Sequence, residues 1–154
     1  LSSAFDTVDH GILLRRLDVS FGITGHALDW FRSYLTGRTQ YTRMGTQRSP
    51  ISFLTGNVPQ GSVLGPVLFL LYSADLQDII IKHSLCPHLY ADDTQIYGSC
   101  HPNDIDQLRE RVSTCIDEVA GWMRANRLQL NTAKTEVIWF ATNRRRSQLP
   151  STGL

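Results

Sequence analysis

The feature that most constrains the fold is an uninterrupted apolar segment, Val67 to Tyr72, which follows Gly65 and Pro66. A helix over these residues would be apolar on all sides, so other elements have to cover it on more than one side. Pro66 is compatible with this helix because proline is tolerated in a first helical turn. The segment therefore predicts a core helix in a globular domain.

The composition agrees with a folded domain that has a core. Apolar residues make up 42% of the 154 residues and charged residues 19%, which is typical of globular proteins. The net charge of +1 neither supports nor excludes a nucleic-acid partner, so basic clusters have to be sought locally. The longest uncharged apolar stretch, residues 62–74, is well short of the roughly 20 residues that cross a bilayer, so no membrane span is predicted.

The cysteines do not indicate a disulfide framework. Their number is odd and they form no CxxC pair, which fits reduced intracellular thiols; they are Cys86, Cys100 and Cys115. A zinc cluster drawn from the histidines and cysteines of residues 83–101 is a second interpretation, but their spacing matches no zinc finger. We expect these side chains to be ordinary core and surface residues.

Apolar periodicity predicts a mixed order of helices and strands. Helices are expected over residues 11–17, 25–35 and 67–72, and a long helix from a cap at Asn103 to about residue 127. Short strands are expected between residues 38 and 58, with a turn at 47–50, then as a hairpin within 85–97 and as a strand over 135–141. This order predicts an α+β fold, an antiparallel sheet with helices packed on one face. A polar stretch at 142–154, with arginines at 144–146, is expected to be a basic, disordered tail.

Two adjacent carboxylates, Asp92 and Asp93, fall at the tip of the expected hairpin. A divalent cation relieves their mutual repulsion, and hard oxygen ligands suit Mg²⁺. Paired ions roughly 3.5 to 4 Å apart can activate a hydroxyl and stabilise a leaving phosphate oxygen, so the pair favours phosphoryl transfer. Since successive strand side chains face opposite ways, a further carboxylate would have to come from another strand. Taken alone, an Asp-Asp turn is more often a solvated surface turn.

The Asp92–Asp93 pair belongs to one of four motifs that follow one another in the order of a known family. Residues 90–93 read YADD and resemble the YxDD box of reverse transcriptases, and residues 59–66 read PQGSVLGP, similar to the PQGSxLGP signature of non-LTR retrotransposons. Residues 1–10, LSSAFDTVDH, resemble the first catalytic box of that family, and residues 130–136, LNTAKTE, resemble its fourth motif. The matches extend over residues 1–141. The sequence thus resembles a partial palm of a LINE-type reverse transcriptase of the Jockey/CR1 kind.

The resemblance implies a set of metal ligands. Asp92 and Asp93 would bind Mg²⁺, or Mn²⁺ in its place, together with the backbone carbonyl of Leu1. The leading aspartate of the first box would precede Leu1. Asp6 and Asp9 match positions that the family does not use as its principal metal ligands, so neither is expected to bind the metal.

The resemblance also implies nucleotide contacts. Gln60 and Gly61 would line the incoming dNTP, and Phe5 would be the steric gate whose ring leaves no room for a ribose 2′-hydroxyl. Gly61 has no Cβ, so a nucleotide can approach its backbone, although a Pro/Gly turn that enters a core helix explains the same residues structurally. Lys134 would approach the triphosphate, where a cation could protonate the leaving pyrophosphate.

The implied function is an RNA-directed DNA polymerase that extends a DNA primer on an RNA template with dNTPs. The fingers and the thumb of the parent polyprotein would lie outside this chain, and the family implies an intracellular protein with nuclear access. The alternative from another class is an inactive retroelement relic that serves as a folded nucleic-acid-binding or interaction module. A viral RNA polymerase is disfavoured because such enzymes commonly carry Gly-Asp-Asp and have to accept the 2′-hydroxyl that Phe5 would oppose.

Overall fold

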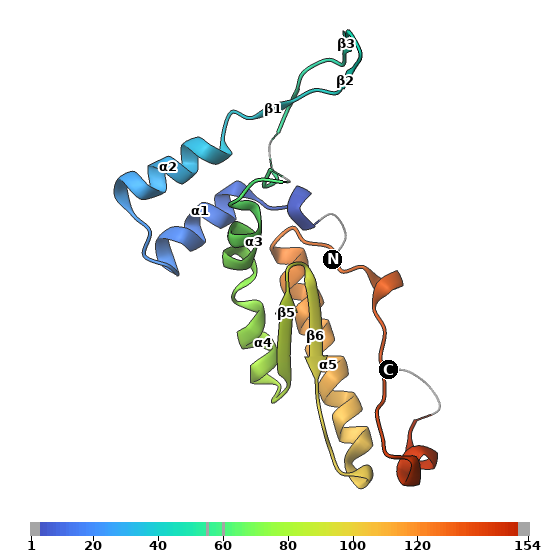
Figure 1. Cartoon of the computed structure of the whole chain (residues 1–154). Coiled ribbons are helices and arrows are strands. Elements are labelled where there is room, and N and C mark those ends of the chain that lie inside the picture. The colour runs from blue at the N-terminus through green and yellow to red at the C-terminus, as the bar shows by residue number, and fades with distance from the viewer. Residues whose placement is uncertain (1–3, 55, 60, 151–154) are drawn as a thin grey trace. The chain divides into compact units, whose positions relative to one another are not determined.

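The structure is a computed structural model that describes residues 4–54, 56–59 and 61–150 (Figure 1). Its elements divide into two compact units, each described by itself below. The N-terminal unit comprises Ser3–Ala74 and Asn126–Leu128, and the C-terminal unit comprises Asp75–Ala125 and Gln129–Leu154. Both helices and antiparallel strand pairs are present, so the protein has a mixed α+β fold.

The N-terminal unit is built around three helices. They are α1 (His10–Val19), α2 (Gly25–Leu35) and α3 (Gly65–Ser73), preceded by the 3-10 turn η1 (Ala4–Asp6). Helix α1 contacts both α2 and α3 and buries Leu13, Leu14 and Leu17 at the spacing of one helical stripe. The helices predicted over residues 11–17, 25–35 and 67–72 are therefore confirmed.

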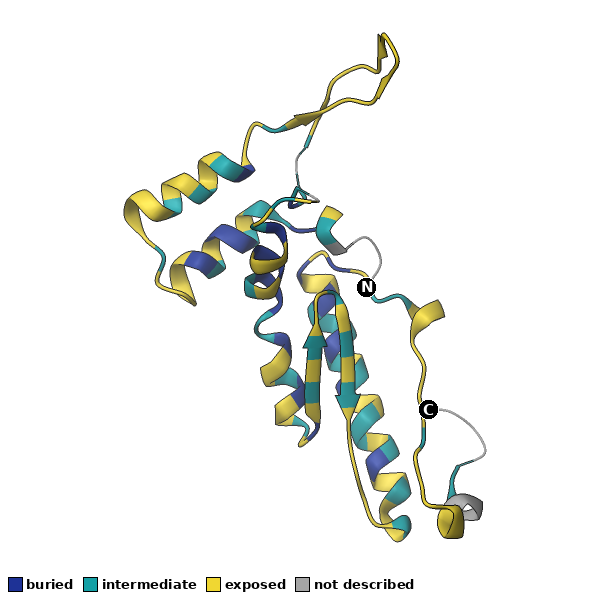
Figure 2. Ribbon diagram, viewed as in Figure 1, coloured by how far each residue is buried: buried dark blue, intermediate teal, exposed yellow. Residues whose placement is uncertain are grey.

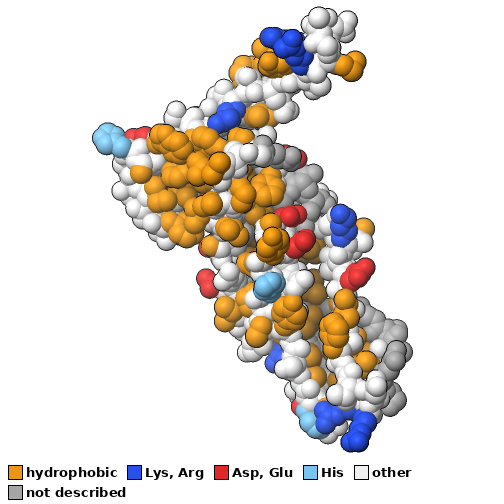
Figure 3. Space-filling model, in the orientation of Figure 1, with side chains coloured by type: hydrophobic (Ala, Val, Ile, Leu, Met, Phe, Trp, Pro, Cys, Tyr) orange, Lys and Arg blue, Asp and Glu red, His pale blue; other side chains and the backbone are white. Residues whose placement is uncertain are grey.

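Helix α3 is a core helix on one face only. It buries Leu68, Phe69 and Tyr72, but Val67 is 50% exposed and Leu70 is 47% exposed. Burial on more than one side was expected from the apolar run, and that expectation is wrong, because the buried residues of α3 lie on one face of the helix. Figure 3 shows hydrophobic side chains gathered on the surface over the helices of this unit.

Four short strands connect α2 to α3. They are β1 (Thr39–Gln40), β2 (Arg43–Met44), β3 (Gln47–Arg48) and β4 (Ser52–Phe53), with β1 paired to β4 and β2 paired to β3. The turn predicted at residues 47–50 is misplaced, because the pairing of Met44 with Gln47 makes Gly45 and Thr46 the reversal. Gly45 has φ +61°, a conformation that suits glycine at the first central position of a two-residue hairpin turn.

The C-terminal unit combines one antiparallel hairpin with helices. Its elements are α4 (Leu76–Lys82), β5 (Cys86–Tyr90), β6 (Asp93–Tyr97), η2 (Pro102–Asp104), α5 (Ile105–Ala125), η3 (Thr132–Lys134) and η4 (Asn143–Gln148). Helix α4 contacts both β5 and α5, and burial alternates along both strands, as Figure 2 shows. The end of the hairpin packs closely, since a Cβ built on Gly98 would lie 2.7 Å from Leu108 Cδ1 and 2.8 Å from Leu85 Cδ2.

The hairpin and the long helix were predicted correctly, and two details were not. Helix α5 begins at Ile105 after η2, and it is His101 whose side chain accepts a hydrogen bond from the amide of Asn103, so Asn103 is not the cap. The predicted strand over residues 135–141 is wrong, because this segment pairs with no strand among the described residues. Phe140, within that apolar run, is 86% exposed.

The C-terminal stretch contains regular structure among its described residues. The 3-10 helix η4 lies within the stretch expected to be a disordered tail, and the boundary at residue 142 stays a prediction. No described helix combines the length and the apolar character needed to span a bilayer.

Candidate active site

The carboxylate pair lies at the reversal of the β5–β6 hairpin. Tyr90 pairs with Asp93, so Ala91 and Asp92 form a two-residue turn. Ala91 has φ +52°, a left-handed conformation that glycine adopts more readily, so a residue with a Cβ is held there at some cost. Asp93 opens strand β6 and is exposed, whereas Asp92 is half-buried in the turn.

The pair is not completed by a third ligand within the described part of the chain. No group of three or more His, Cys, Asp or Glu side chains that could hold a metal ion occurs among the described residues. Two neighbouring carboxylates on an open turn still fit Mg²⁺, which is often bound through one or two carboxylates while water and substrate phosphates fill the remaining positions. Leu1, the predicted carbonyl ligand, lies outside the described residues.

Phe5 is fixed in the N-terminal unit by its ring and its backbone. The ring lies against that of Phe69 on α3, with centroids 5.1 Å apart and planes at 41°. The carbonyl oxygen of Phe5 accepts a hydrogen bond of 2.8 Å from the amide of Val58, and the carbonyl oxygen of Val8 accepts one of 3.0 Å from Asn57. The structure therefore places the predicted gate beside the segment that enters α3.

The loop before α3 requires glycine for two different reasons. Gly61 has φ +75° and open space where a Cβ would stand, so its backbone conformation selects glycine. At Gly65, a Cβ would lie 3.2 Å from Ser62 Oγ and 3.3 Å from the carbonyl oxygen of Pro59, so close packing selects glycine there. Ser62 Oγ also accepts a hydrogen bond of 3.1 Å from the amide of Gly65. Gln60 lies outside the described residues.

Asp9 has a structural role. Its Oδ1 atom accepts a hydrogen bond of 3.0 Å from the amide of Ile12 and so caps α1. Its Oδ2 atom lies 3.1 Å from Arg127 Nε. These contacts fix the Asp9 carboxylate at the start of α1.

A hydrogen-bonded cluster in the N-terminal unit was missed by sequence reasoning. The Tyr72 hydroxyl donates to the carbonyl oxygen of Asn126 over 2.6 Å, and the Arg16 guanidinium donates to the Tyr72 carbonyl oxygen and, over 2.9 Å, to Asn126 Oδ1. Burial raises the pKa of the Tyr72 phenol above its ordinary value, so the hydroxyl remains a donor at neutral pH. No local pattern could reveal contacts between residues 110 positions apart.

The candidate residues are divided between the two units. Phe5 and Gly61 belong to the N-terminal unit, whereas Asp92, Asp93 and Lys134 belong to the C-terminal unit. Lys134 ends η3 with an exposed side chain that makes no hydrogen bond or ion pair to any described residue. It is therefore available to an external anion.

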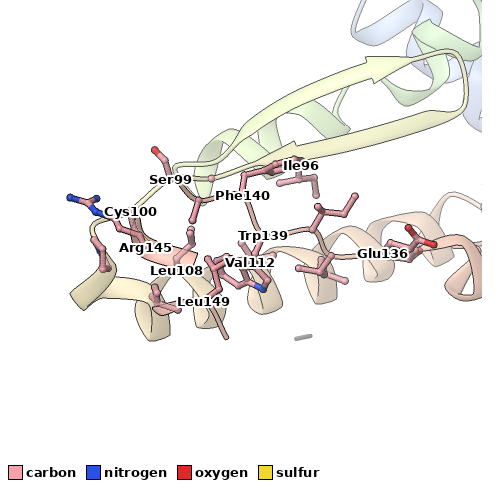
Figure 4. Close-up of a pocket in the computed structure, with 18 of the residues that line it drawn as sticks. Ile96, Ser99, Cys100, Leu108, Val112, Glu136, Trp139, Phe140, Arg145 and Leu149 are labelled. Atoms are coloured by element: carbon pink, nitrogen blue, oxygen red, sulfur yellow. The ribbon is translucent and has the colours of Figure 1, made fainter. Parts of the chain in front are cut away.

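A large apolar cavity lies elsewhere in the C-terminal unit. It has a volume of about 1290 Å³ and lies between β6, α5 and residues 135–145, with Ile96, Val112 and Trp139 among its walls (Figure 4). Trp139 Nε1 is buried there without a hydrogen-bond partner among the described atoms. None of the predicted site residues that the structure describes lines this cavity.

Comparison with known proteins identifies the family. The reverse transcriptase (RNA-dependent DNA polymerase) family matches residues 1–148. The chain is similar to the probable RNA-directed DNA polymerases of transposon BS (29% identity, 88% of this chain and 15% of the relative) and of the X-element (29% identity, 94% and 16%), both from Drosophila melanogaster. It is also similar to the RNA-directed DNA polymerase of the mobile element jockey from Drosophila funebris (26% identity, 91% and 15%).

These relatives extend well beyond the matched region, since the chain spans only about 15% of their length. No solved structure matches the chain significantly. The family assignment does not depend on these relatives alone, because the family match covers nearly all of the sequence. The chain therefore belongs to the reverse transcriptase (RNA-dependent DNA polymerase) family.

Proposed function

We propose that this chain forms the part of a polymerase palm that binds the catalytic metal and the incoming dNTP during RNA-templated synthesis of DNA. The observation that carries the proposal is the position of Asp92 and Asp93 at the reversal of an antiparallel hairpin. In the reaction, the primer 3′-hydroxyl loses its proton to solvent as its oxygen bonds to the α-phosphorus of the dNTP. The bond between that phosphorus and the oxygen that bridges to the β-phosphate breaks, and pyrophosphate leaves.

Asp92 and Asp93 would hold Mg²⁺, with Mn²⁺ as a substitute, and the donor chemistry fits both ions. The bound metal would lower the barrier by stabilising charge on the attacking and leaving oxygens. The tight turn supports this role because it fixes the backbone on both sides of the carboxylates through the pairing of Tyr90 with Asp93. Lys134, with its exposed ammonium group, would either donate a proton to the leaving pyrophosphate or offset its negative charge.

Phe5 would select deoxyribose over ribose. Its ring is restrained by Phe69 and its carbonyl by Val58, so it could not yield easily to a 2′-hydroxyl. The open space beside Gly61 would admit the nucleotide to its backbone, and Gln60 would be a second nucleotide contact.

A second candidate function is a nucleic-acid-binding or interaction module without catalysis. It is favoured by one observation, that no third carboxylate joins Asp92 and Asp93 among the described residues. The two functions differ in whether metal binding is followed by incorporation of a nucleotide. They can therefore be tested in two steps, first on this chain and then in a complete polymerase.

The first step measures metal binding. Mn²⁺ added to the isotope-labelled chain should broaden the amide resonances of residues 90–94, and Asp92→Asn should remove that broadening. Asp106→Asn, an exposed carboxylate on α5, is the matched control and should leave it intact. Equal broadening in the Asp92→Asn protein would contradict the proposed metal site.

The second step measures chemistry. This chain is exchanged for the 149 residues that it matches in the X-element polymerase, and dNTP incorporation is followed on a primed RNA. We expect Mg²⁺-dependent incorporation that Asp92→Ala abolishes and Asp106→Asn does not, and a gain of rNTP use with Phe5→Ala. Incorporation that survives Asp92→Ala would overturn the catalytic proposal, and a folded but inactive hybrid beside an active parent would favour the second function.

A further inference from the structure

The near-neutral net charge conceals a strongly basic region. Residues 30–74 contain four arginines and no aspartate, glutamate or lysine, so this region carries a charge of +4. The rest of the chain carries −3, because the whole chain carries +1. Unbalanced positive charge on one region of a protein attracts polyanions.

The C-terminal half of α2 presents aromatic rings beside one of these arginines. The rings of Trp30 and Tyr34 are stacked, with centroids 5.5 Å apart and planes at 11°. The Arg38 guanidinium lies 4.6 Å from the Tyr34 ring, and its Nε donates to the Tyr34 carbonyl oxygen over 2.7 Å. Trp30 is 54% exposed although it is one of the most apolar side chains of the helix.

The β1–β4 segment that follows α2 also places an arginine beside an exposed aromatic ring. The Arg48 guanidinium lies 5.1 Å from the ring of Tyr41, which is 48% exposed, and Arg43 Nε donates to the Gly45 carbonyl oxygen over 3.0 Å. Figure 3 shows basic and hydrophobic side chains on the β2–β3 hairpin and no acidic ones in that view. Arg38, Arg43 and Arg48 form no ion pair with a carboxylate among the described residues, and Phe53 on β4 adds a third exposed ring.

Exposed rings and unpaired guanidinium groups together match one ligand chemistry. Rings stack on unpaired bases, and arginines bind phosphate through paired N–H donors. A duplex offers the phosphates but keeps its base faces stacked inside, and an acidic protein offers carboxylates without bases. The combination therefore favours single-stranded nucleic acid.

We propose that this aromatic and basic surface, formed by Trp30, Tyr34, Arg38, Tyr41, Arg43, Arg48 and Phe53, is a binding surface for single-stranded RNA. Only the choice of RNA rests on the proposed function, in which the template is RNA. The surface is distinct from the candidate active site, because none of its residues is a metal or nucleotide ligand in that proposal. It would hold unpaired template, with guanidinium groups on the phosphates and rings on the bases.

Fluorescence anisotropy with a labelled, unstructured RNA of roughly 15 nucleotides tests the surface on the full chain. EDTA is present throughout, so the proposed metal site takes no part in the binding that is measured. The double variant Arg43→Gln/Arg48→Gln should weaken binding on the order of tenfold and reduce the slope of log K against log salt by about 1.4, which corresponds to two lost phosphate contacts. Trp30→Ala should weaken binding at least about fivefold and leave that slope unchanged.

The matched control is Arg144→Gln/Arg145→Gln, which removes the same charge from two exposed arginines of the C-terminal stretch. This control should bind RNA nearly as tightly as the wild type, and circular dichroism should show all variants folded. An equal loss of affinity in this control would overturn the proposal, as would equal affinity for a duplex of the same sequence. Equal competition by polyglutamate would also overturn it and would point to an acidic protein partner.

Discussion

The Nε2 atom of His10 lies 2.7 Å from the backbone carbonyl oxygen of Asn57, so the first residue of α1 is joined to the loop that leads into α3. Because the carbonyl can only accept, Nε2 carries the proton. Asn57 has φ +95°, and its amide donates to the carbonyl oxygen of Val8 on the same side of this junction. His10 therefore holds a strained loop beside the segment that carries Phe5.

Replacing His10 should destabilise the fold in a way that depends on the donor. His10→Leu leaves the Asn57 carbonyl without its partner and should lower the free energy of unfolding by about 1 kcal/mol. His10→Gln retains an N–H donor and should restore part of that loss. Urea denaturation measures both variants, and equal unfolding midpoints for Leu and Gln would contradict a hydrogen-bonding role.

Ala91→Gly should stabilise the hairpin that carries the carboxylates. Ala91 occupies a left-handed conformation at φ +52°, so removing its Cβ should raise the free energy of unfolding by roughly 0.5 to 1 kcal/mol. Ala133→Gly, at an exposed position with ordinary φ, is the control and should not stabilise the protein. A thermal melt distinguishes the two, and a lower melting temperature for Ala91→Gly would show that the turn does not strain its alanine.

Local patterns predicted the elements whose own residues specify them. Helix α1 follows from its apolar stripe of Leu13, Leu14 and Leu17, and the β5–β6 hairpin follows from alternation around a short polar turn. The motifs that contain Phe5 and Gly61 could be recognised because each is contiguous in sequence, and the nucleotide contacts of these two residues stay predictions.

The features that were missed depend on partners distant in sequence. The apolar run at 135–141 has the composition of a strand, but a strand forms only where a neighbour offers a free edge. The exposure of Val67 could not be predicted, because the covering of α3 depends on where α1 packs. The strongly basic region of residues 30–74 was concealed by the net charge of the whole chain, although a count of charged residues over separate segments would have revealed it.

Tyr72→Phe removes a single oxygen atom but should lower the free energy of unfolding clearly. The buried hydroxyl donates a hydrogen bond to the Asn126 carbonyl oxygen, and phenylalanine would leave this carbonyl without its donor. We expect a loss of about 1 to 3 kcal/mol in the free energy of unfolding, measured by urea denaturation. Tyr41→Phe removes the hydroxyl of an exposed tyrosine and should leave stability nearly unchanged, so equal costs for the two variants would refute the assigned role of Tyr72.

Glu118 should make the stability of the C-terminal unit depend on acid pH. Its carboxylate oxygens lie 2.7 Å from Lys82 Nζ and 2.7 Å from His83 Nε2, and hydrogen bonds from Lys82 and then His83 hold the pKa of Glu118 below its ordinary value of 4.5. A carboxyl whose pKa is lowered by folding stabilises the protein above the unfolded value. This contribution disappears as the pH falls through the folded value.

The difference in stability between the wild type and Glu118→Gln should therefore be largest above pH 4.5 and shrink below it. Denaturant midpoints measured across an acid pH series give this difference directly, and added salt should reduce it because the groups are partly exposed to solvent. Glu110→Gln, on the same helix without a paired cation among the described residues, should give a difference that hardly varies with pH. If the Glu118→Gln difference were also constant, the contacts with Lys82 and His83 would not stabilise the folded protein.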